Sequence, residues 1–173
     1  MADTEMQTLD DVLLAKEHNT NADIVDIGQT MIKLVIFTLD ENWYAFLGKN
    51  VKEVLSDIAV SALPGCPLSL EGVINVRGDI ESVISLRHLF QYPPIENMDK
   101  TRILLGSSEA MRSGIRVDTV EEILSITEDS IVEPPATLPP YMAPIVSGVI
   151  QLNDQTVTIL DLDKIFNNYH DGL

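Results

Sequence analysis

The side chains that most often perform catalysis are scarce in this sequence and lie far apart. The three histidines are His18, His88 and His170, and the single cysteine is Cys66. No carboxylate or cysteine lies near a histidine at the spacing of a metal site, and no basic residue close in sequence would activate the Cys66 thiol. We therefore expect an inert thiol and no metal. We expect His88, in the motif SLRHLF, to be structural rather than a phosphate acceptor.

Glycine-rich loops that bind phosphate are the next candidates, and the sequence contains none. Isolated glycines of this kind fit turns and places where backbones pack closely, so we predict structural roles for them. Without a nucleophile–base pair, a metal cluster or a phosphate loop, the sequence predicts a protein that is not an enzyme and needs no cofactor. The four glycines that adjoin predicted strands are Gly72, Gly78, Gly114 and Gly148.

The composition favours a folded protein that acts by binding other proteins. Of the 173 residues 45% are hydrophobic, which is enough for a packed core, and the formal net charge is −16. Such a charge repels nucleic-acid phosphates and anionic lipids. The apolar runs are far shorter than the roughly 20 residues that span a bilayer, and the start does not resemble a secretory signal. We predict a cytoplasmic location, no nucleic acid among the partners and no direct insertion into a membrane.

The elements that would position any site begin after an acidic N-terminal segment, which we place at 1–31. Its first 30 residues contain seven acidic residues and one basic residue, Lys16. Leu9, Val12 and Leu13 are spaced as on a short helix. Two readings stay open for this segment: a frayed tail, or an apolar face that docks on the body or on a partner.

From Ile32 onward the sequence changes to short runs of β-branched and apolar residues separated by turn residues. The intervals are too short for alternating helices, so small antiparallel barrels fit better than a parallel βαβ architecture. Brief helical turns are expected at 86–90 and 162–166. The predicted strand runs are 32–39, 43–47, 54–58, 72–76, 80–84, 103–105, 114–117, 123–126, 146–152 and 156–160.

An internal repeat relates the two halves of this region. EGVINVRGDIESVISLRHLF (71–90) aligns without gaps on SGVIQLNDQTVTILDLDKIF (147–166), at an offset of 76 residues. Two upstream blocks repeat at an offset of 69 residues, and the proline-rich loop 133–144 accounts for the difference. Three blocks in one order make chance similarity improbable. The upstream blocks are 33–36 with 102–105 and 51–56 with 120–125.

The repeat predicts an all-β fold of two pseudo-symmetric small barrels, with a first subdomain at 32–98 and a second at 99–173. Barrels of this size have little core of their own and gain stability by packing against each other. The groove between them is the expected binding site, because partner sites favour subdomain interfaces.

The segment PLSLEGVINVRGDIESVISLR (67–87) resembles the signature of the chemotaxis coupling protein family, the CheW-like domain. GIRVDTVEEIL (114–124) and the block 147–166 resemble later parts of the family pattern in the same order, so the resemblance covers about 33–166. It implies two five-stranded barrels that share a core, with the strand at 33–39 as an alternative member of the second barrel.

The function that the resemblance implies is that of an adaptor. It would couple the cytoplasmic helices of methyl-accepting chemotaxis receptors to the regulatory domain of a CheA-type histidine kinase. It would be recruited to membrane receptor arrays through these partners, without a cofactor. Two alternatives stay open: an adaptor of a non-flagellar system such as twitching or gliding motility, and a small-ligand-binding barrel.

The resemblance also places a set of residues around the groove between the barrels. Glu53 and Arg77 lie near it, and the repeat pairs Glu53 with Glu122 but Arg77 with Asn153, so only the first half has the arginine. An ion pair that fixes the barrel and a contact with the receptor are both open readings. The other predicted residues of the receptor groove are apolar, with core packing as the alternative: Val51, Val120 and Ile123.

Several positions depart from the family pattern. Glu81-Ser82 stand where the family continues with a hydrophobic residue and proline, and Ser85 replaces a common aspartate. Gly48 stands where an aliphatic residue usually faces the kinase. These departures bear on the kinase contact more than on the fold.

Overall fold

Strand β1 (Met31–Leu39) shows why this chain folds around more than one core. In the computed structural model, which describes residues 28–171 and side chains as far as Tyr169, the run Leu34–Phe37 is buried throughout. Leu34 and Ile36 pack into one hydrophobic cluster, whereas Val35 and Phe37 pack into another. A strand with both faces buried has a continuous apolar sequence, as this one does. His18, the predicted N-terminal helix and the His170 side chain lie outside the described residues.

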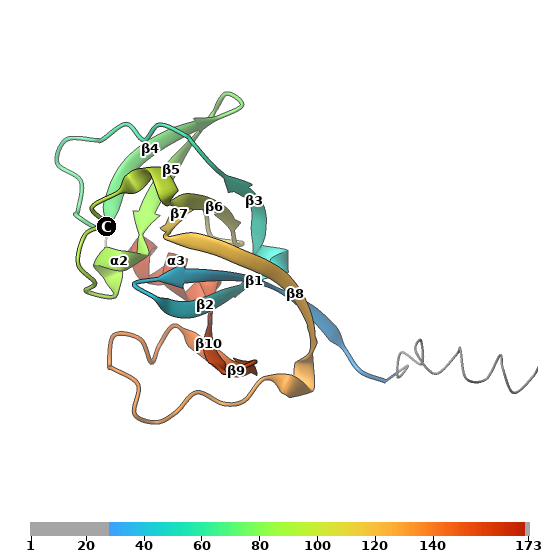
Figure 1. Ribbon diagram of the computed structural model, residues 1–173. Coiled ribbons are helices and arrows are strands. Elements are labelled where there is room, and N and C mark those ends of the chain that lie inside the picture. The colour runs from blue at the N-terminus through green and yellow to red at the C-terminus, as the bar shows by residue number, and fades with distance from the viewer. Residues whose placement is uncertain (1–27, 172–173) are drawn as a thin grey trace, which may run out of the picture. The chain divides into compact units, whose positions relative to one another are not determined.

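Ten strands form two five-stranded sheets, which confirms the predicted all-β class (Figure 1). Sheet A has the order β8-β1-β2-β10-β9, and β2 and β10 are its parallel pair. Its strands besides β1 are β2 (Asn42–Leu47), β8 (Thr119–Thr127), β9 (Val146–Leu152) and β10 (Gln155–Leu160).

Sheet B has the order β3-β6-β7-β5-β4, and β5 and β7 are its parallel pair. Its strands are β3 (Val51–Leu55), β4 (Leu70–Val76), β5 (Asp79–Ser85), β6 (Arg102–Ser107) and β7 (Arg112–Val117). The helical elements are short: η1 (Gly48–Asn50), α2 (Leu86–Leu89), η2 (Met98–Lys100), η3 (Glu128–Ser130) and α3 (Leu162–Asp171).

The strand orders of the two sheets are related by the internal repeat. Exchanging the labels β1–β5 with β6–β10 turns the order of sheet A into that of sheet B. The single β-bridges that flank the sheets, Ser61 with Val73 and Val132 with Val149, also fall at equivalent places on β4 and β9. Topology therefore supports the duplication that the sequence predicts.

The sheets do not coincide with the predicted subdomain boundaries at 32–98 and 99–173. Strands β1 and β2 lie in sheet A with β8, β9 and β10, and strands β6 and β7 lie in sheet B with β3, β4 and β5. Each half thus gives its first hairpin to the other half. The resemblance had left the strand at 33–39 as an alternative member of the second barrel, and β1 does lie with β8, β9 and β10. A repeat shows which segments are equivalent but not which segments pair, so the places of β2, β6 and β7 were not predicted.

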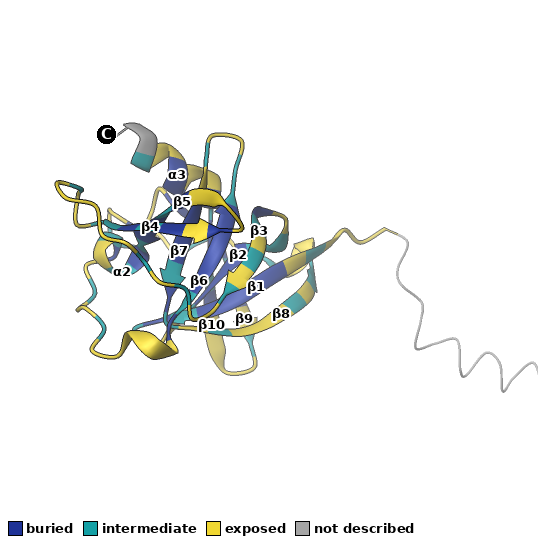
Figure 2. Cartoon of the chain, turned by 90° about the horizontal axis from the view of Figure 1, so that it is seen from above, coloured by how far each residue is buried: buried dark blue, intermediate teal, exposed yellow. Residues whose placement is uncertain are grey.

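Three hydrophobic clusters hold the sheets together, and the burial pattern is visible in Figure 2. The largest lies between the sheets and contains Phe37, Phe46, Phe90 and Phe166. Burying one such phenylalanine contributes roughly 1.5–3 kcal/mol. The other two clusters belong to one sheet each, so neither half could keep its core after the exchanged hairpins separate.

Gly72 and Gly148 let a neighbouring segment cross the sheet at equivalent places. Gly72 has φ +150°, and a Cβ there would lie 2.2 Å from the carbonyl oxygen of Ser61. A Cβ at Gly148 would lie 2.4 Å from Cγ2 of Ile131. Both approaches are far inside van der Waals contact. A side chain at Gly72 would collide with backbone atoms, whereas one at Gly148 would first displace the side chain of Ile131.

Gly78 and Gly114 have different local roles. Gly78 has φ +98° in the two-residue turn between β4 and β5, with open space around it. A Cβ on Gly114, inside β7, would lie 2.8 Å from Cγ2 of Ile103 on β6. The first glycine permits a turn and the second permits close packing.

Candidate functional site

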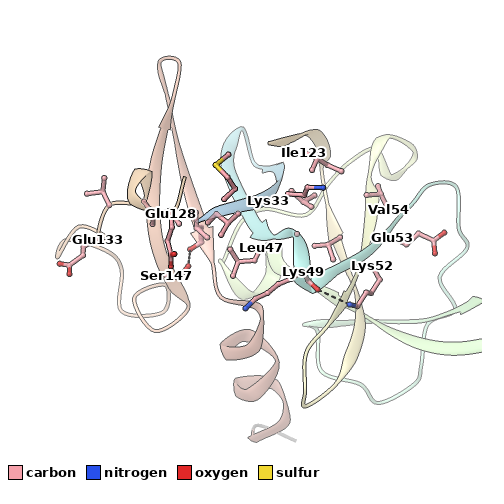
Figure 3. Close-up of a pocket in the computed structure, with 18 residues that line it drawn as sticks. Lys33, Leu47, Lys49, Lys52, Glu53, Val54, Ile123, Glu128, Glu133 and Ser147 are labelled. Carbon is pink, nitrogen blue, oxygen red and sulfur yellow. Dashed lines mark hydrogen bonds between the residues drawn. The ribbon is translucent and has the colours of Figure 1, made fainter. Parts of the chain in front are cut away.

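A groove of about 1250 Å³ lies between strands of the two sheets (Figure 3). One wall comes from β3 of sheet B and from η1, and the other comes from β1, β8 and the segment after β8 in sheet A. Strands β3 and β8 are edge strands of their sheets, so each has one side on which no neighbouring strand pairs with its backbone.

The groove exposes large apolar side chains from both sheets. Val54 on β3 is 41% exposed and Ile123 on β8 is 65% exposed. Met31 and Val132 are also exposed and line the groove. Val54 and Ile123 are equivalent in the internal repeat, so the two edge strands present the same position from opposite sides. Exposed apolar residues gathered in a groove mark a protein-binding surface.

Charged side chains divide the groove into a basic and an acidic part. Lys33, Lys49 and Lys52 lie around η1, whereas Glu128 and Glu133 lie on the segment after β8 (Figure 3). Nζ of Lys52 donates to the carbonyl oxygen of Lys49 at 3.3 Å, which keeps these two lysines on one turn.

Gly48 brings the η1 turn against β1. A Cβ on Gly48 would lie 3.0 Å from Cβ of Lys33 and 3.2 Å from its carbonyl oxygen. The glycine therefore permits close contact between Lys33 and the turn that carries Lys49. Gly48, which departs from the family pattern, is thus a groove residue.

Glu53, on the groove wall, is held by Arg77. The two guanidinium nitrogens of Arg77 donate to the two carboxylate oxygens of Glu53 at 2.8 and 2.6 Å. This hydrogen bonding lowers the pKa of Glu53 below its ordinary value, and the charge of Arg112 acts in the same direction. Arg77 has φ +53°, a region that favours glycine or asparagine, and its repeat equivalent Asn153 also has φ +53°.

The structure brings together three of the five residues that were predicted for the groove. Val51, Glu53 and Ile123 line it. Arg77 does not line it but reaches it through Glu53. Val51 and Val120 both pack against the central core, and Val120 does not line the groove. A register shift in the pairing of β1 with β8 leaves Val120 opposite the buried Phe37, on the core face of the strand.

Other groove residues were not predicted. Val54 could have been found, because the repeat aligns it with Ile123. The lysines around η1 carried no signal of this kind, because only the fold places the turn after β2 beside Lys33 on β1. The remaining lining residues are Ile32, Val35, Leu47, Ile131, Ser147 and Ile159.

Glu81 and Ser82, which depart from the family pattern, contact side chains on the neighbouring strand β7. Glu81 is buried, and Oε1 of its carboxylate forms an ion pair with Nε of Arg112 at 2.8 Å. Oγ of Ser82 and Oγ of Ser113 are 2.8 Å apart. The repeat equivalents of Glu81 and Arg112 are Val157 and Trp43, an apolar pair on adjacent strands of sheet A.

Ser85, the third departure, caps helix α2. Its hydroxyl oxygen accepts from the backbone N–H of His88 at 3.3 Å, a role that serine and aspartate side chains share. His88 itself lies on this helix and not in the groove. Cys66 is half-buried in the loop between β3 and β4.

A half-buried ion-pair network lies outside the groove. Arg87 donates to both carboxylate oxygens of Asp118 at 2.9 and 2.8 Å, and also contacts Asp40 at 3.3 Å. The hydrogen bond with Asp118 raises the pKa of Arg87, so the arginine stays charged. The network ties α2 to the β1–β2 and β7–β8 turns and serves the fold.

Residues 28–171 lack two further kinds of feature. No three His, Cys, Asp or Glu side chains in this range are grouped to hold a metal ion. No helix there is long and apolar enough to cross a membrane.

Comparison with known proteins gives one consistent result. The profile of the CheW-like domain matches residues 33–170. The chain is 24% identical over 146 residues to the chemotaxis protein CheW of Treponema pallidum, covering 82% of this chain and 86% of that protein. It is 27% identical over 138 residues to the protein of that name from Helicobacter pylori, with coverages of 80% and 83%. The crystal structure of the scaffolding protein TtCheW from Thermoanaerobacter tengcongensis aligns with a TM-score of 0.70 and 32% identity, covering 77% of this chain and 90% of that one.

Proposed function

Because this chain belongs to the family of CheW-like domains, we propose that it couples chemoreceptors to a CheA-type histidine kinase. Members of the family are non-catalytic scaffolds of chemotaxis, so the chain is a scaffold and not an enzyme. The predicted family resemblance is thereby confirmed. The finer assignment of partners rests on the arguments that follow.

The groove is the receptor site in this proposal, and the exposed pair Val54 and Ile123 is the observation that carries it. An amphipathic helix presents apolar anchors at i, i+3/i+4 and i+7 and is about 10 Å across. A groove with apolar side chains on both walls can accept such anchors, as a cytoplasmic receptor helix would supply them. Without a partner, the apolar side chains of Val54 and Ile123 would stay exposed to water, which is unfavourable.

The Arg77–Glu53 ion pair shapes one wall of this site. By engaging both oxygens of Glu53, Arg77 fixes the carboxylate beside Val54 instead of leaving it to rotate into the groove. Arg77 occupies a backbone conformation that costs energy for a residue of its type, and strain of this sort concentrates at functional sites. The pair thus supports the fold and the receptor contact together.

The kinase regulatory domain binds outside the groove, on sheet B. Ile80, at the start of β5, is 64% exposed. Next to it, Glu81 forms an ion pair with Arg112, and the hydroxyl groups of Ser82 and Ser113 are hydrogen-bonded. The two residues that depart from the family pattern therefore have polar partners at this face. An exposed apolar side chain beside satisfied polar ones suits a protein–protein contact.

Placement at receptor arrays follows from the partners and not from a membrane anchor. The chain would act in the cytoplasm and reach the membrane only by binding receptors. Its net charge of −16 disfavours nucleic acid as a partner. Adaptors of twitching or gliding systems would use the same two contacts with other receptors.

Titration of purified protein with a receptor cytoplasmic fragment and, separately, with a kinase regulatory domain tests this proposal. Ile123→Asp should weaken receptor binding at least tenfold and spare the kinase domain, whereas Ile80→Asp should do the reverse. Leu68→Asp is the control for both, since Leu68 is 80% exposed and lies outside the groove. Unchanged receptor affinity in Ile123→Asp would refute the groove as the receptor site.

A further inference from the structure

The lysines of the groove stand out in the charge distribution of the chain. Among the described residues, five cations form ion pairs with carboxylates: Arg77, Arg87, Arg112, Arg116 and Lys164. Five others form none with any described carboxylate, and three of these line the groove. The five are Lys33, Lys49, Lys52, Lys100 and Arg102.

This arrangement is unusual because the chain has 27 acidic residues against 11 basic ones. Carboxylates are plentiful, yet Lys33, Lys49 and Lys52 line one groove and form no ion pair with a described carboxylate. The groove carboxylate nearest to them in sequence, Glu53, is already engaged at both oxygens by Arg77. The lysines therefore form a small positive surface inside an acidic protein, and that surface adjoins the exposed side chains of Val54 and Ile123.

We propose that the helix which binds in this groove is acidic, with carboxylates flanking its apolar stripe and facing Lys33, Lys49 and Lys52. This inference rests on the proposed receptor function of the groove and adds the chemistry of the helix that it selects. Carboxylates would complete the ion pairs that the groove lacks. The opposite part of the groove, with Glu128 and Glu133, disfavours carboxylates, so the acidic residues lie toward one end of the helix (Figure 3).

The net charge of the chain strengthens the preference of the groove for an acidic helix. The net charge of −16 repels an acidic helix from the surface as a whole, so the lysines favour binding of such a helix in the groove. A basic helix would be attracted to many acidic sites and would meet repulsion where its apolar stripe should bind. Repulsion away from the site and attraction at the site give specificity together.

The test uses two synthetic helical peptides that share one apolar stripe and differ only in flanking glutamates or flanking lysines. Binding is measured at low and at high salt. The acidic peptide should bind more tightly at low salt. Its advantage should fade near 1 M salt, where the screening length is about 3 Å. Each exposed ion pair is a modest effect, so we expect a total preference of about tenfold.

Variants of matched charge separate the local effect from the global one. Lys49→Glu with Lys52→Glu should weaken acidic-peptide binding about tenfold or more at low salt. Lys100→Glu with Lys164→Glu changes the net charge equally but lies outside the groove, and it should have less than a twofold effect. Equal losses in both double variants would overturn the proposal.

Three other results of the peptide measurement would also overturn the proposal. Equal affinity for both peptides, lost in Ile123→Asp, would overturn the acidic preference and leave the groove as a helix site. Tighter binding of the lysine peptide in the groove would overturn the preference as well. Binding of neither peptide would overturn this inference together with the groove assignment on which it rests.

Discussion

The guanidinium of Arg77 donates two hydrogen bonds to the carboxylate of Glu53, and this pair ties edge strand β3 to the turn after edge strand β4. These strands are the two ends of sheet B, and within residues 28–171 no backbone ladder joins them. The ion pair therefore bridges an opening that hydrogen-bonded strands leave. Sheet A has Glu122 and Asn153 at the equivalent places, and no described ion pair joins them.

Replacing Arg77 with asparagine removes this bridge and keeps a residue that tolerates positive φ, as Asn153 does in the other half. Arg77→Asn should weaken receptor binding several-fold and leave kinase binding within about twofold. Titration of both partners against this variant checks the result. Equal losses for both partners would mean that Arg77 only holds the fold together.

The pH dependence of Glu53 provides a direct probe of the same pair. Hydrogen bonding from Arg77 lowers the pKa of Glu53 in the folded state below 4.5, its ordinary value. A depressed carboxyl pKa means that the stabilisation is complete above the unfolded value and is lost as pH falls through the folded one. Carboxyl-carbon NMR titration should give a higher midpoint for Glu53 in Arg77→Asn than in the unaltered chain. An unchanged midpoint would show that the ion pair is absent in solution.

The two crossing-point glycines should respond differently to an added methyl group. At Gly72 the obstructing atom is the backbone oxygen of Ser61 and φ is positive, whereas at Gly148 it is a side-chain methyl of Ile131 that can move. Gly72→Ala should cost about 3 kcal/mol of unfolding free energy and Gly148→Ala about 1 kcal/mol. Denaturant unfolding measures both, with Gly28→Ala as the control because nothing lies within 4 Å of its Cβ position. The reverse ranking would contradict the described approach of Ser61.

The Glu81–Arg112 pair can be exchanged for the apolar pair of the other sheet. Arg112→Trp alone leaves the buried Glu81 carboxylate without its cation and should cost about 3 kcal/mol. Adding Glu81→Val copies Trp43 and Val157 and should recover most of that loss, since buried ion pairs are often replaceable by apolar residues. Thermal and denaturant unfolding of the two single variants and the double variant test this. Additive losses would mean that the two positions do not interact.

More of the fold than of the groove could be predicted from the sequence. The repeat predicted two equivalent β units, and the equivalent strand orders of the two sheets support this prediction. Gly72 and Gly148 lie at equivalent places, and each is approached closely by a neighbouring segment. The resemblance allowed the strand at 33–39 to belong to the second barrel, and β1 lies in the sheet with β8, β9 and β10. The exchange of β2, β6 and β7 was not predicted, because a repeat shows which segments are equivalent and not which segments pair. Ile123 was predicted for the groove, while Lys49 and Lys52 were not, since only the fold brings η1 beside β1.

The proposed scaffold works by holding two partners at once, and kinase autophosphorylation over a wide range of adaptor concentration measures this bridging. With receptor present, kinase output should rise as the adaptor bridges receptor and kinase. It should then fall when excess adaptor occupies each partner separately, because binary complexes compete with the ternary one. Ile123→Asp should abolish the rise. Activation that never declines at excess adaptor, or equal activation by Ile123→Asp, would contradict the bridging account.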